Sequence, residues 1–269
     1  MSEKSVNDLM HEEKHDFASL VDIMKILRSE NGCPWDREQD HKSIRANFIE
    51  ETYEVVEAID NQDSALLREE LGDVLLQVIF HARISEEDGE FSINVVIHDI
   101  CAKLIHRHPH IFGNVQADTS DVVLENWEKI KKEEKQRVGL SGTLQSIPPS
   151  LPALMRAQKV VKKCAKENLS PCSKDALNHL KASAVHLASE GTSENKDTLR
   201  KDLREILVSA SVVAQANELD AEEILYDACG HITEVVRSAE QNGTVPLAKL
   251  SEDERESLVD RAFFQNNPQ

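Results

Sequence analysis

The chain has 269 residues and a formal net charge of −18, and only 4% of its residues are aromatic. This length is enough for one large domain or two modest ones. The acidic charge argues against a nucleic-acid polymer as partner, because phosphates attract basic patches, and the lack of a long apolar run argues against a membrane span.

Cysteine usage predicts the compartment. The five cysteines are odd in number and form no Cys-x-x-Cys pair: Cys33, Cys101, Cys164, Cys172 and Cys229. Together with the lack of a recognisable signal peptide, they predict a reduced, soluble, cytoplasmic protein. Aromatic residues are few, and glycine and proline are scarce outside two stretches, so we expect an all-α fold.

The first residues are expected to lead into a helix. Residues 1–16 are polar and acidic without a periodic apolar pattern, which predicts a loosely held leader. Apolar residues then recur at helical spacing over 17–27. The stretch 33–36 is expected to be a loop, because glycine and proline interrupt helices. Trp35 in this loop could stack on a base or close the end of a helical bundle, and physical grounds favour the second.

The segment 49–80 carries five acids on otherwise apolar helical sequence: Glu50, Glu51, Glu54, Glu70 and Asp73. Residues three or four apart share a face of a helix, so Glu51 lies beside Glu54, and Glu70 lies beside Asp73. A break at 61–63 allows the chain to turn and return antiparallel. The two acidic faces could then meet across a helical hairpin.

The second half of this hairpin predicts the chemistry of the acids. From 70 to 80 the polar side chains are Glu70, Asp73 and Gln77, and a helix that is apolar on nearly all other sides is a buried helix. Buried carboxylates need positive charge to compensate theirs, and no nearby run of Lys or Arg is large enough to supply it.

All-oxygen ligation suits hard cations that also bind phosphates. We therefore predict Mg²⁺, with Mn²⁺ possible, and a phosphate ester or anhydride substrate; the alternative is that the acids only solubilise helices. The predicted ligands are Glu51, Glu54, Glu70 and Asp73.

Two further helices follow, over about 92–106 and 120–135. Ser92 is a candidate cap for the first, and Lys103 and Arg107 lie one turn apart on it. This pair could clasp phosphates or only complement the helix dipole, and the residues leave both open. Histidines at 106, 108 and 110 suggest zinc, but no cysteine stands at ligand spacing, and a helix end with a turn at Pro109 is favoured.

Three blocks in order resemble a known family. Glu-x-x-Glu followed by Glu-x-x-Asp is preceded by Gly32-Cys33-Pro34-Trp35-Asp36 and followed by Arg107-His108-Pro109-His110-Ile111-Phe112. Together they resemble the MazG nucleoside triphosphate pyrophosphohydrolases of the all-α NTP pyrophosphatase superfamily. The resemblance covers about residues 20–135.

The resemblance implies a fold and an activity. The expected fold is a helical-bundle repeat of four-helix-bundle type, completed in a homodimer. The expected activity is Mg²⁺-dependent hydrolysis of a nucleoside triphosphate to the monophosphate and pyrophosphate, in house-cleaning or control of the nucleotide pool. Glu50 is a candidate for orienting or deprotonating the attacking water; equally, it could support the ligands or be merely exposed. The resemblance makes Lys103, Arg107 and Trp127 candidate nucleotide contacts.

The remaining chain is predicted to hold a degenerate copy of this domain. After the domain at 17–135 we expect a linker at 136–152, helices over 153–240, and a polar tail at 241–269 that ends in disorder. The helical patterns cover 153–166, 175–189, 197–217 and 221–240, the last opened by Asp220 with Glu223 as a capping box.

A shift of 132 residues lays Asp202-Leu203-Arg204-Glu205 on Glu70-Leu71-Gly72-Asp73. The same shift puts Ser183 and His186 at the positions of Glu51 and Glu54. Half of the ligands are missing, so metal binding there should be weak or absent.

Three other classes compete with this interpretation. A di-iron carboxylate bundle would need Glu-x-x-His pairs, which the chain lacks at these positions. An HD-type phosphohydrolase could be proposed from His98-Asp99 alone, which is a weak signal. A non-catalytic helical regulator or scaffold with a vestigial site fits the second half better than the first, which keeps all four acids.

Overall fold

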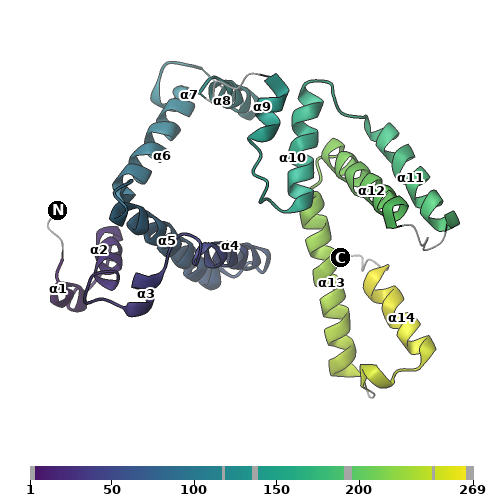
Figure 1. Ribbon diagram of the computed structural model, residues 1–269, viewed down its shortest axis with the longest axis horizontal. Helices are drawn as coiled ribbons and strands as arrows, with labels where there is room; N and C mark the ends of the chain where they lie inside the picture. The colour runs from purple at the N-terminus through teal and green to yellow at the C-terminus, as the bar shows by residue number, and fades with distance from the viewer. Residues whose placement is uncertain (1–3, 117–118, 135–138, 191–195, 244–245, 265–269) are drawn as a thin grey trace. The chain divides into compact units, whose positions relative to one another are not determined.

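The computed structural model describes residues 4–116, 119–134, 139–190, 196–243 and 246–264 (Figure 1). Within these ranges the chain forms fourteen α-helices and a short 3₁₀ helix, and no β-strand. This confirms the all-α class. None of the described helices is both long and apolar enough to cross a membrane. The chain divides into two compact units, Met1–Lys131 and Lys132–Gln269.

The start of the chain is more ordered than its composition predicts. Helix α1 (Val6–Met10) precedes α2 (Phe17–Leu27) and begins with a capping box. The Lys4 ammonium contacts the Glu12 carboxylate at 2.5 Å and the Ser19 hydroxyl at 2.8 Å. The expectation of a loosely held leader is therefore wrong for residues 4–16, because the contacts that hold them are made with α2.

The predicted loop at 33–36 is also a correction. Pro34 opens a short helix, α3 (Pro34–Glu38), at the N1 position that suits its fixed φ. The turn before it requires glycine, since a Cβ on Gly32 would lie 2.2 Å from the Leu27 carbonyl oxygen. Trp35 is exposed on α3.

Helices α4 (Arg45–Asp60) and α5 (Ser64–Glu87) form the hairpin that the acidic segment predicts, and they pack along each other. Gln62 turns the chain with φ of 55°. The Asp63 carboxylate then caps α5 by accepting hydrogen bonds from the backbone N–H groups of Ala65 and Leu66, both at 3.0 Å.

One flank of α5 belongs to the core of the first unit. That core consists of Met24, Ile44, Ile79, Phe80, Ala82, Ile84 and Ile93. The polar stripe is buried at Glu70 and Gln77, which are 9% and 7% exposed, whereas Asp73 is half-buried. The other flank is a correction: Leu71 and Leu75 are 51% and 37% exposed, so the described part of the first unit does not by itself bury α5 on all sides.

Three helices complete the first unit: α6 (Ile93–Arg107), α7 (Pro109–Phe112) and α8 (Ser120–Glu134). The predicted helix end and turn at Pro109 is confirmed, since α6 stops at Arg107 and Pro109 begins α7. Ser92 occupies the N-cap position of α6, but its side chain makes no capping hydrogen bond.

The helices predicted for the second unit are present with shifts of a few residues. They are α10 (Ala153–Lys166), α11 (Ser173–Glu190), α12 (Lys196–Ala216) and α13 (Ala221–Asn242). The Asp220 carboxylate caps α13 by accepting from the backbone N–H of Glu222 and Glu223. The reciprocal Glu223 bond of a capping box is not among the contacts of the described residues.

Two segments of the second unit are more helical than predicted. The expected linker contains α9 (Gly139–Gln145), and residues 135–138 lie outside the described ranges. The expected polar tail contains η1 (Leu247–Lys249) and α14 (Glu252–Phe263), which packs on α13. The Ser251 and Glu254 capping box starts α14. The disorder predicted for the chain end falls on residues 265–269, outside the described ranges.

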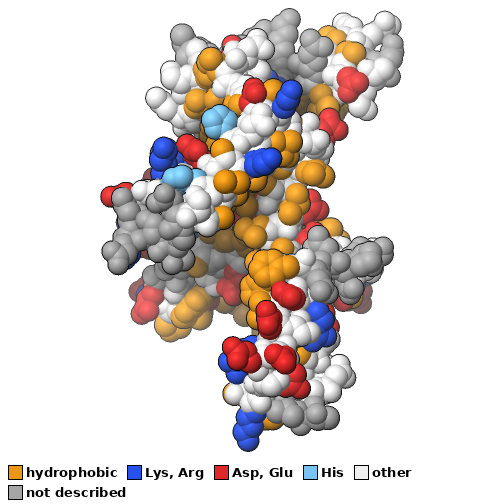
Figure 2. All heavy atoms as spheres, turned by 90° about the vertical axis from the view of Figure 1, so that its right-hand side faces the viewer, with side chains coloured by type: hydrophobic (Ala, Val, Ile, Leu, Met, Phe, Trp, Pro, Cys, Tyr) orange, Lys and Arg blue, Asp and Glu red, His pale blue; other side chains and the backbone are white. Residues whose placement is uncertain are grey.

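Hydrophobic side chains also lie on the surface of the second unit. Leu154, Leu199, Leu203 and Leu207 line a groove of about 670 Å³ between α10 and α12. In Figure 2 exposed hydrophobic side chains lie among acidic and basic ones.

Candidate metal centre

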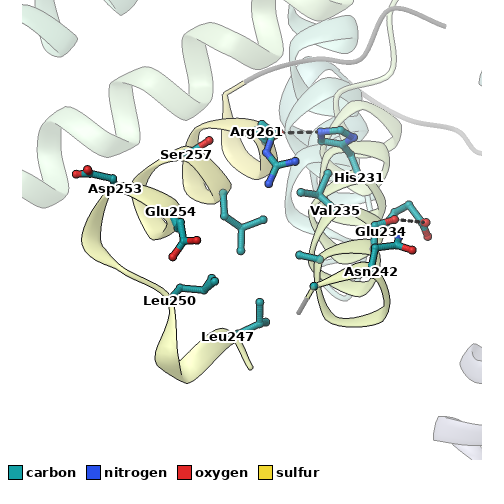
Figure 3. A pocket seen from close by; sticks show the side chains of 14 residues that line it. His231, Glu234, Val235, Asn242, Leu247, Leu250, Asp253, Glu254, Ser257 and Arg261 are labelled. Carbon is teal, nitrogen blue, oxygen red and sulfur yellow. Dashed lines mark hydrogen bonds between the residues drawn. The ribbon is translucent and has the colours of Figure 1, made fainter. Parts of the chain in front are cut away.

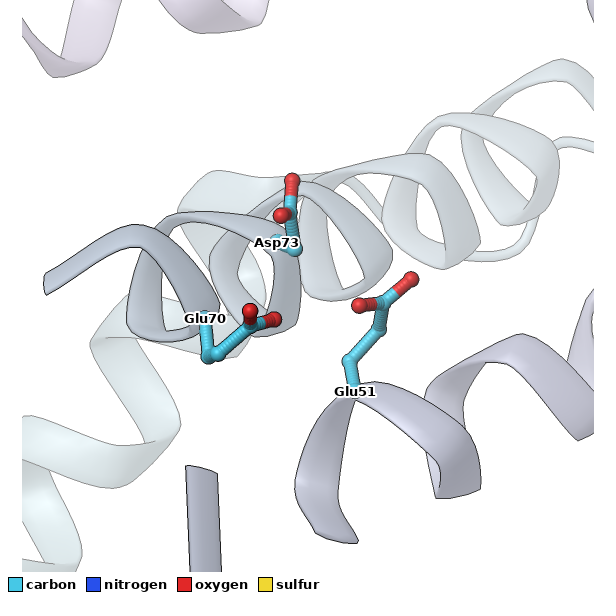
Figure 4. A group of neighbouring side chains, drawn as sticks. All are labelled: Glu51, Glu70 and Asp73. Atoms are coloured by element: carbon cyan, nitrogen blue, oxygen red, sulfur yellow. The ribbon is translucent and has the colours of Figure 1, made fainter. Parts of the chain in front are cut away.

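Three carboxylates converge across the α4–α5 hairpin. Ligand oxygen atoms of Glu51, Glu70 and Asp73 all lie within 4.8 Å of one another. Glu51 projects from α4, and Glu70 and Asp73 project toward it from neighbouring turns of α5 (Figure 4). Within the described residues, no other three His, Cys, Asp or Glu side chains come this close.

Electrostatics place Glu54 in the same cluster. Burial raises the pKa of Glu51, and a hydrogen bond with Glu54 and the charge of Asp73 raise it further. Burial also raises the pKa of Glu70, and the charges of Glu54 and Asp73 add to the effect. Three of the four predicted ligands therefore converge, and Glu54 interacts electrostatically with two of them, Glu51 and Glu70.

Nothing in the described protein neutralises these charges. Among the side chains that the structure describes, no Lys or Arg forms an ion pair with any of the four acids. Several carboxylates that share a partly buried site repel one another, and a divalent cation relieves that repulsion by accepting their oxygens. The donor set and its charge thus fit a hard metal ion.

The other predicted site residues have different surroundings. Glu50 lies on α4 next to Glu51 in sequence and is exposed. On α6, Lys103 is exposed whereas Arg107 is buried. The Arg107 guanidinium carbon lies 5.2 Å from the centroid of the Trp127 ring on α8, so the structure joins these two residues in a cation–π contact.

The sequence analysis missed a histidine pair between the turn before α4, which carries His41, and α5, which carries His81. The His41 and His81 rings stack with centroids 5.1 Å apart and their Nδ1 atoms at 2.8 Å, while His41 Nε2 lies 3.2 Å from the Ser85 hydroxyl. Burial lowers the pKa of His81, and the charge of His41 lowers it further. The signal was available, since Gln77, His81 and Ser85 continue the stripe of Asp73 at four-residue spacing.

The zinc and HD alternatives gain no support. His108 Nδ1 lies 2.6 Å from the Leu104 carbonyl oxygen, and its ring stacks obliquely on His110 at 5.6 Å. His98 and Asp99 are exposed on α6. Neither set belongs to a three-ligand cluster of described residues.

The α11–α12 hairpin of the second unit holds its acids differently. The Ser183 hydroxyl donates to Glu205 at 2.8 Å, and His186 Nδ1 contacts the Asp202 carboxylate at 2.6 Å. Ser183 and Asp202 are both buried. The buried Asp202 and the half-buried Glu205 therefore each have a side-chain partner on the opposite helix.

A groove of about 1070 Å³ between α13 and α14 offers no comparable chemistry (Figure 3). His231 Nε2 contacts the Arg261 carbonyl oxygen at 3.1 Å, and the Glu254 carboxylate accepts a hydrogen bond from the Ser251 backbone N–H. Acids outnumber the single arginine along the lining, which disfavours a phosphate ligand there.

Comparison with known proteins finds a family whose matched region includes the α4–α5 hairpin. The MazG nucleotide pyrophosphohydrolase domain matches residues 39–112, a stretch that contains the four carboxylates. The nucleoside triphosphate pyrophosphohydrolase of Escherichia coli (strain K12) is 50% identical over 147 residues, which are 54% of this chain and 56% of that protein.

Two further relatives come from other organisms. The nucleoside triphosphate pyrophosphohydrolase/pyrophosphatase MazG of Thermotoga maritima is 47% identical over 144 residues, 54% of each chain. The nucleoside triphosphate pyrophosphohydrolase of Mycolicibacterium smegmatis is 34% identical over 243 residues, 87% of this chain and 68% of that protein.

The all-α hairpin with its converging carboxylates, together with the matching domain, places the chain in the class of all-α nucleotide pyrophosphohydrolases. Within that class, this chain belongs to the MazG family of nucleoside triphosphate pyrophosphohydrolases. It spans about half the length of the Escherichia coli and Thermotoga maritima relatives.

Proposed function

We propose that the chain hydrolyses nucleoside triphosphates to the monophosphate and pyrophosphate. Glu51, Glu54, Glu70 and Asp73 would hold Mg²⁺, with Mn²⁺ as a substitute of the same ligand preference. The observation that supports this most directly is the convergence of Glu51, Glu70 and Asp73 within 4.8 Å. The names of the relatives support the reaction.

The hairpin itself supplies positioning. When bound, Mg²⁺ would neutralise triphosphate charge and lower the pKa of a water molecule. The α4–α5 packing holds Glu51 opposite Glu70 and Asp73 before any ligand arrives, so the carboxylates need little reorganisation. Water adds to the α-phosphorus, and the bond to the pyrophosphate leaving group breaks.

Other predicted residues have proposed roles around this centre. Glu50 is the candidate for orienting or deprotonating the attacking water. Lys103 and Arg107 are candidate phosphate contacts, and Trp127 a candidate nucleotide contact. The Arg107 contact with Trp127 supports treating these two as one unit, because Trp127 holds the guanidinium in place.

The test is product analysis with a panel of NTPs and dNTPs, with and without Mg²⁺, for the wild type and Glu54→Ala. We expect Mg²⁺-dependent release of pyrophosphate and monophosphate that disappears in the variant. Orthophosphate release would overturn the bond assigned. No turnover with any nucleotide would favour the alternative of a non-catalytic regulator or scaffold.

We further propose that the second unit is a degenerate copy that does not bind metal. A shift of 132 residues places Asp202 and Glu205 of α12 at the positions of Glu70 and Asp73 on α5. The Ser183–Glu205 and His186–Asp202 contacts stand where the first unit has four carboxylates. These contacts satisfy the two remaining acids without a cation.

A homodimer is proposed as the functional assembly. Large apolar side chains of the first unit are exposed along both helices of the hairpin: Ile49, Tyr53, Ile59, Leu71 and Leu75. A second chain that covered them would complete a four-helix arrangement. Sedimentation equilibrium with a mass of one chain would overturn this proposal.

The five free cysteines agree with the proposed cytoplasmic location.

A further inference from the structure

One side chain on the polar stripe of α5 has no partner in the described protein. Gln77 lies one turn after Asp73 and is 7% exposed. Its Oε1 atom is fully buried and accepts no hydrogen bond among the described residues. A buried acceptor without a donor is disfavoured, and each such group in a folded protein calls for an explanation.

A second glutamine shows how the chain treats this residue type elsewhere. Gln158 on α10 is also 7% exposed. Its Nε2 donates to the Leu219 carbonyl oxygen at 2.7 Å, and its Oε1 accepts from the Ala221 N–H at 2.8 Å. The same burial is thus fully satisfied in the second unit and unsatisfied in the hairpin.

Gln77 shares a face of α5 with two acids of the carboxylate cluster. Residues 70, 73 and 77 share one face of α5, and helical side chains lean toward the N-terminus, over the preceding turn. The turn that precedes Gln77 carries Asp73. Ionised carboxylates are acceptors only, so neither Asp73 nor Glu70 can supply the missing donor.

We propose that Gln77 is a positioning residue of the metal centre, whose Oε1 accepts a hydrogen bond from a water molecule in the hydration shell of Mg²⁺. Mg²⁺ keeps several waters when proteins bind it, and these waters are donors that fit a lone acceptor. Groups that hold the surroundings of a metal in place set its affinity. This inference rests on the proposed function, since it requires Mg²⁺ at the cluster.

The test is isothermal titration of the full chain with Mg²⁺ alone, without nucleotide. Gln77→Met fills the same space without an acceptor, and we expect Mg²⁺ affinity to fall at least about tenfold. Its melting temperature in chelator should not fall, because an unsatisfied acceptor has been removed. Gln77→Glu keeps an oxygen at the position and should bind Mg²⁺ at least as tightly as the wild type.

Gln158→Met is the matched control, with a lower melting temperature and unchanged Mg²⁺ affinity. Wild-type affinity in Gln77→Met would overturn the inference and leave the metal centre standing. If that variant does not fold, Gln77→Asn decides, because it withdraws the oxygen by one methylene: unchanged affinity overturns the inference, and weakened affinity supports it. A wild type that binds no Mg²⁺ would overturn the metal centre and this inference together.

Discussion

At the scale of single residues, the first unit concentrates negative charge where the described side chains supply no cation. Glu70 is buried, and its pKa is raised by burial and then by the charges of Glu54 and Asp73. Such a cluster costs folding free energy in the absence of metal. The residues that destabilise the metal-free protein are therefore the ones expected to bind the ion.

Asp73→Asn separates these two effects. We expect loss of Mg²⁺ binding and a fall in pyrophosphate release of at least about a hundredfold, because a ligand is lost from the centre. The melting temperature in chelator should stay equal or rise, because repulsion with Glu51 and Glu70 is relieved. Retention of most of the activity would contradict the ligand assignment.

His81 makes stability depend on pH. Its pKa is lowered by burial and then by His41, so the folded state binds fewer protons than the unfolded state below the ordinary histidine pKa of about 6.5. This contribution is present above about pH 6.5 and is lost as pH falls toward the lowered pKa. We expect the melting temperature of His81→Gln to fall less than that of the wild type between pH 7.5 and 5.5. Equal slopes would refute this, and His98→Gln serves as control because His98 is exposed on α6.

At the scale of elements, the hairpin is anchored by one arginine from α2. Arg28 has a side chain only 6% exposed and donates from Nη2 to the Glu87 carboxylate on α5 at 2.8 Å. Its Nη1 donates to the carbonyl oxygens of Asp36 and Gln39 beside α3, and its guanidinium carbon lies 5.3 Å from the Phe80 ring centroid. One side chain thus joins α2, α3 and α5.

Arg28→Ala should lower the free energy of unfolding by about 2 kcal/mol, because the carbonyl oxygens of Asp36 and Gln39 lose their donor and the packing against Phe80 is lost, whereas Arg83 still donates to the partly exposed Glu87. Urea denaturation of the full chain measures this. Arg237→Ala is the matched control, since that arginine pairs with Glu234 on an exposed helix face, and the expected cost is below about 0.5 kcal/mol. Similar costs for the two variants would contradict the anchoring role.

At the scale of the whole molecule, the α4–α5 and α11–α12 hairpins correspond under the shift of 132 residues, but their acidic side chains have different surroundings. The first brings the carboxylates of Glu51, Glu70 and Asp73 together, and the second pairs Asp202 with His186 and Glu205 with Ser183. The acids of the second hairpin thus have side-chain partners. This contrast supports the proposal that the first unit carries the chemistry.

His186→Ala in the full chain checks this division. It should destabilise the second unit, because the buried Asp202 carboxylate loses its partner. Mg²⁺ affinity and pyrophosphate release per folded molecule should stay at wild-type values. Loss of Mg²⁺ binding in this variant would show that the second hairpin contributes to the metal centre.

Local sequence was sufficient for most of the secondary structure. The bounds of α2 and α10 agree with the predicted 17–27 and 153–166, because apolar spacing and capping residues act over a few neighbouring positions. The acidic pairs on α4 and α5 were found for the same reason. Predictions were wrong for α1, α3, α9 and α14, which are short or polar helices that periodicity does not detect.

The sequence by itself determined the all-α class, the hairpin and the four candidate metal ligands, because helical periodicity and the charge of a side chain are local properties. Only the tertiary structure decided how Glu51 meets Glu70 and Asp73, which atoms Arg28 joins, and that the Gln77 oxygen has no donor. Those properties depend on the packing of segments distant in the chain, where small differences in helix contact decide which polar groups find partners.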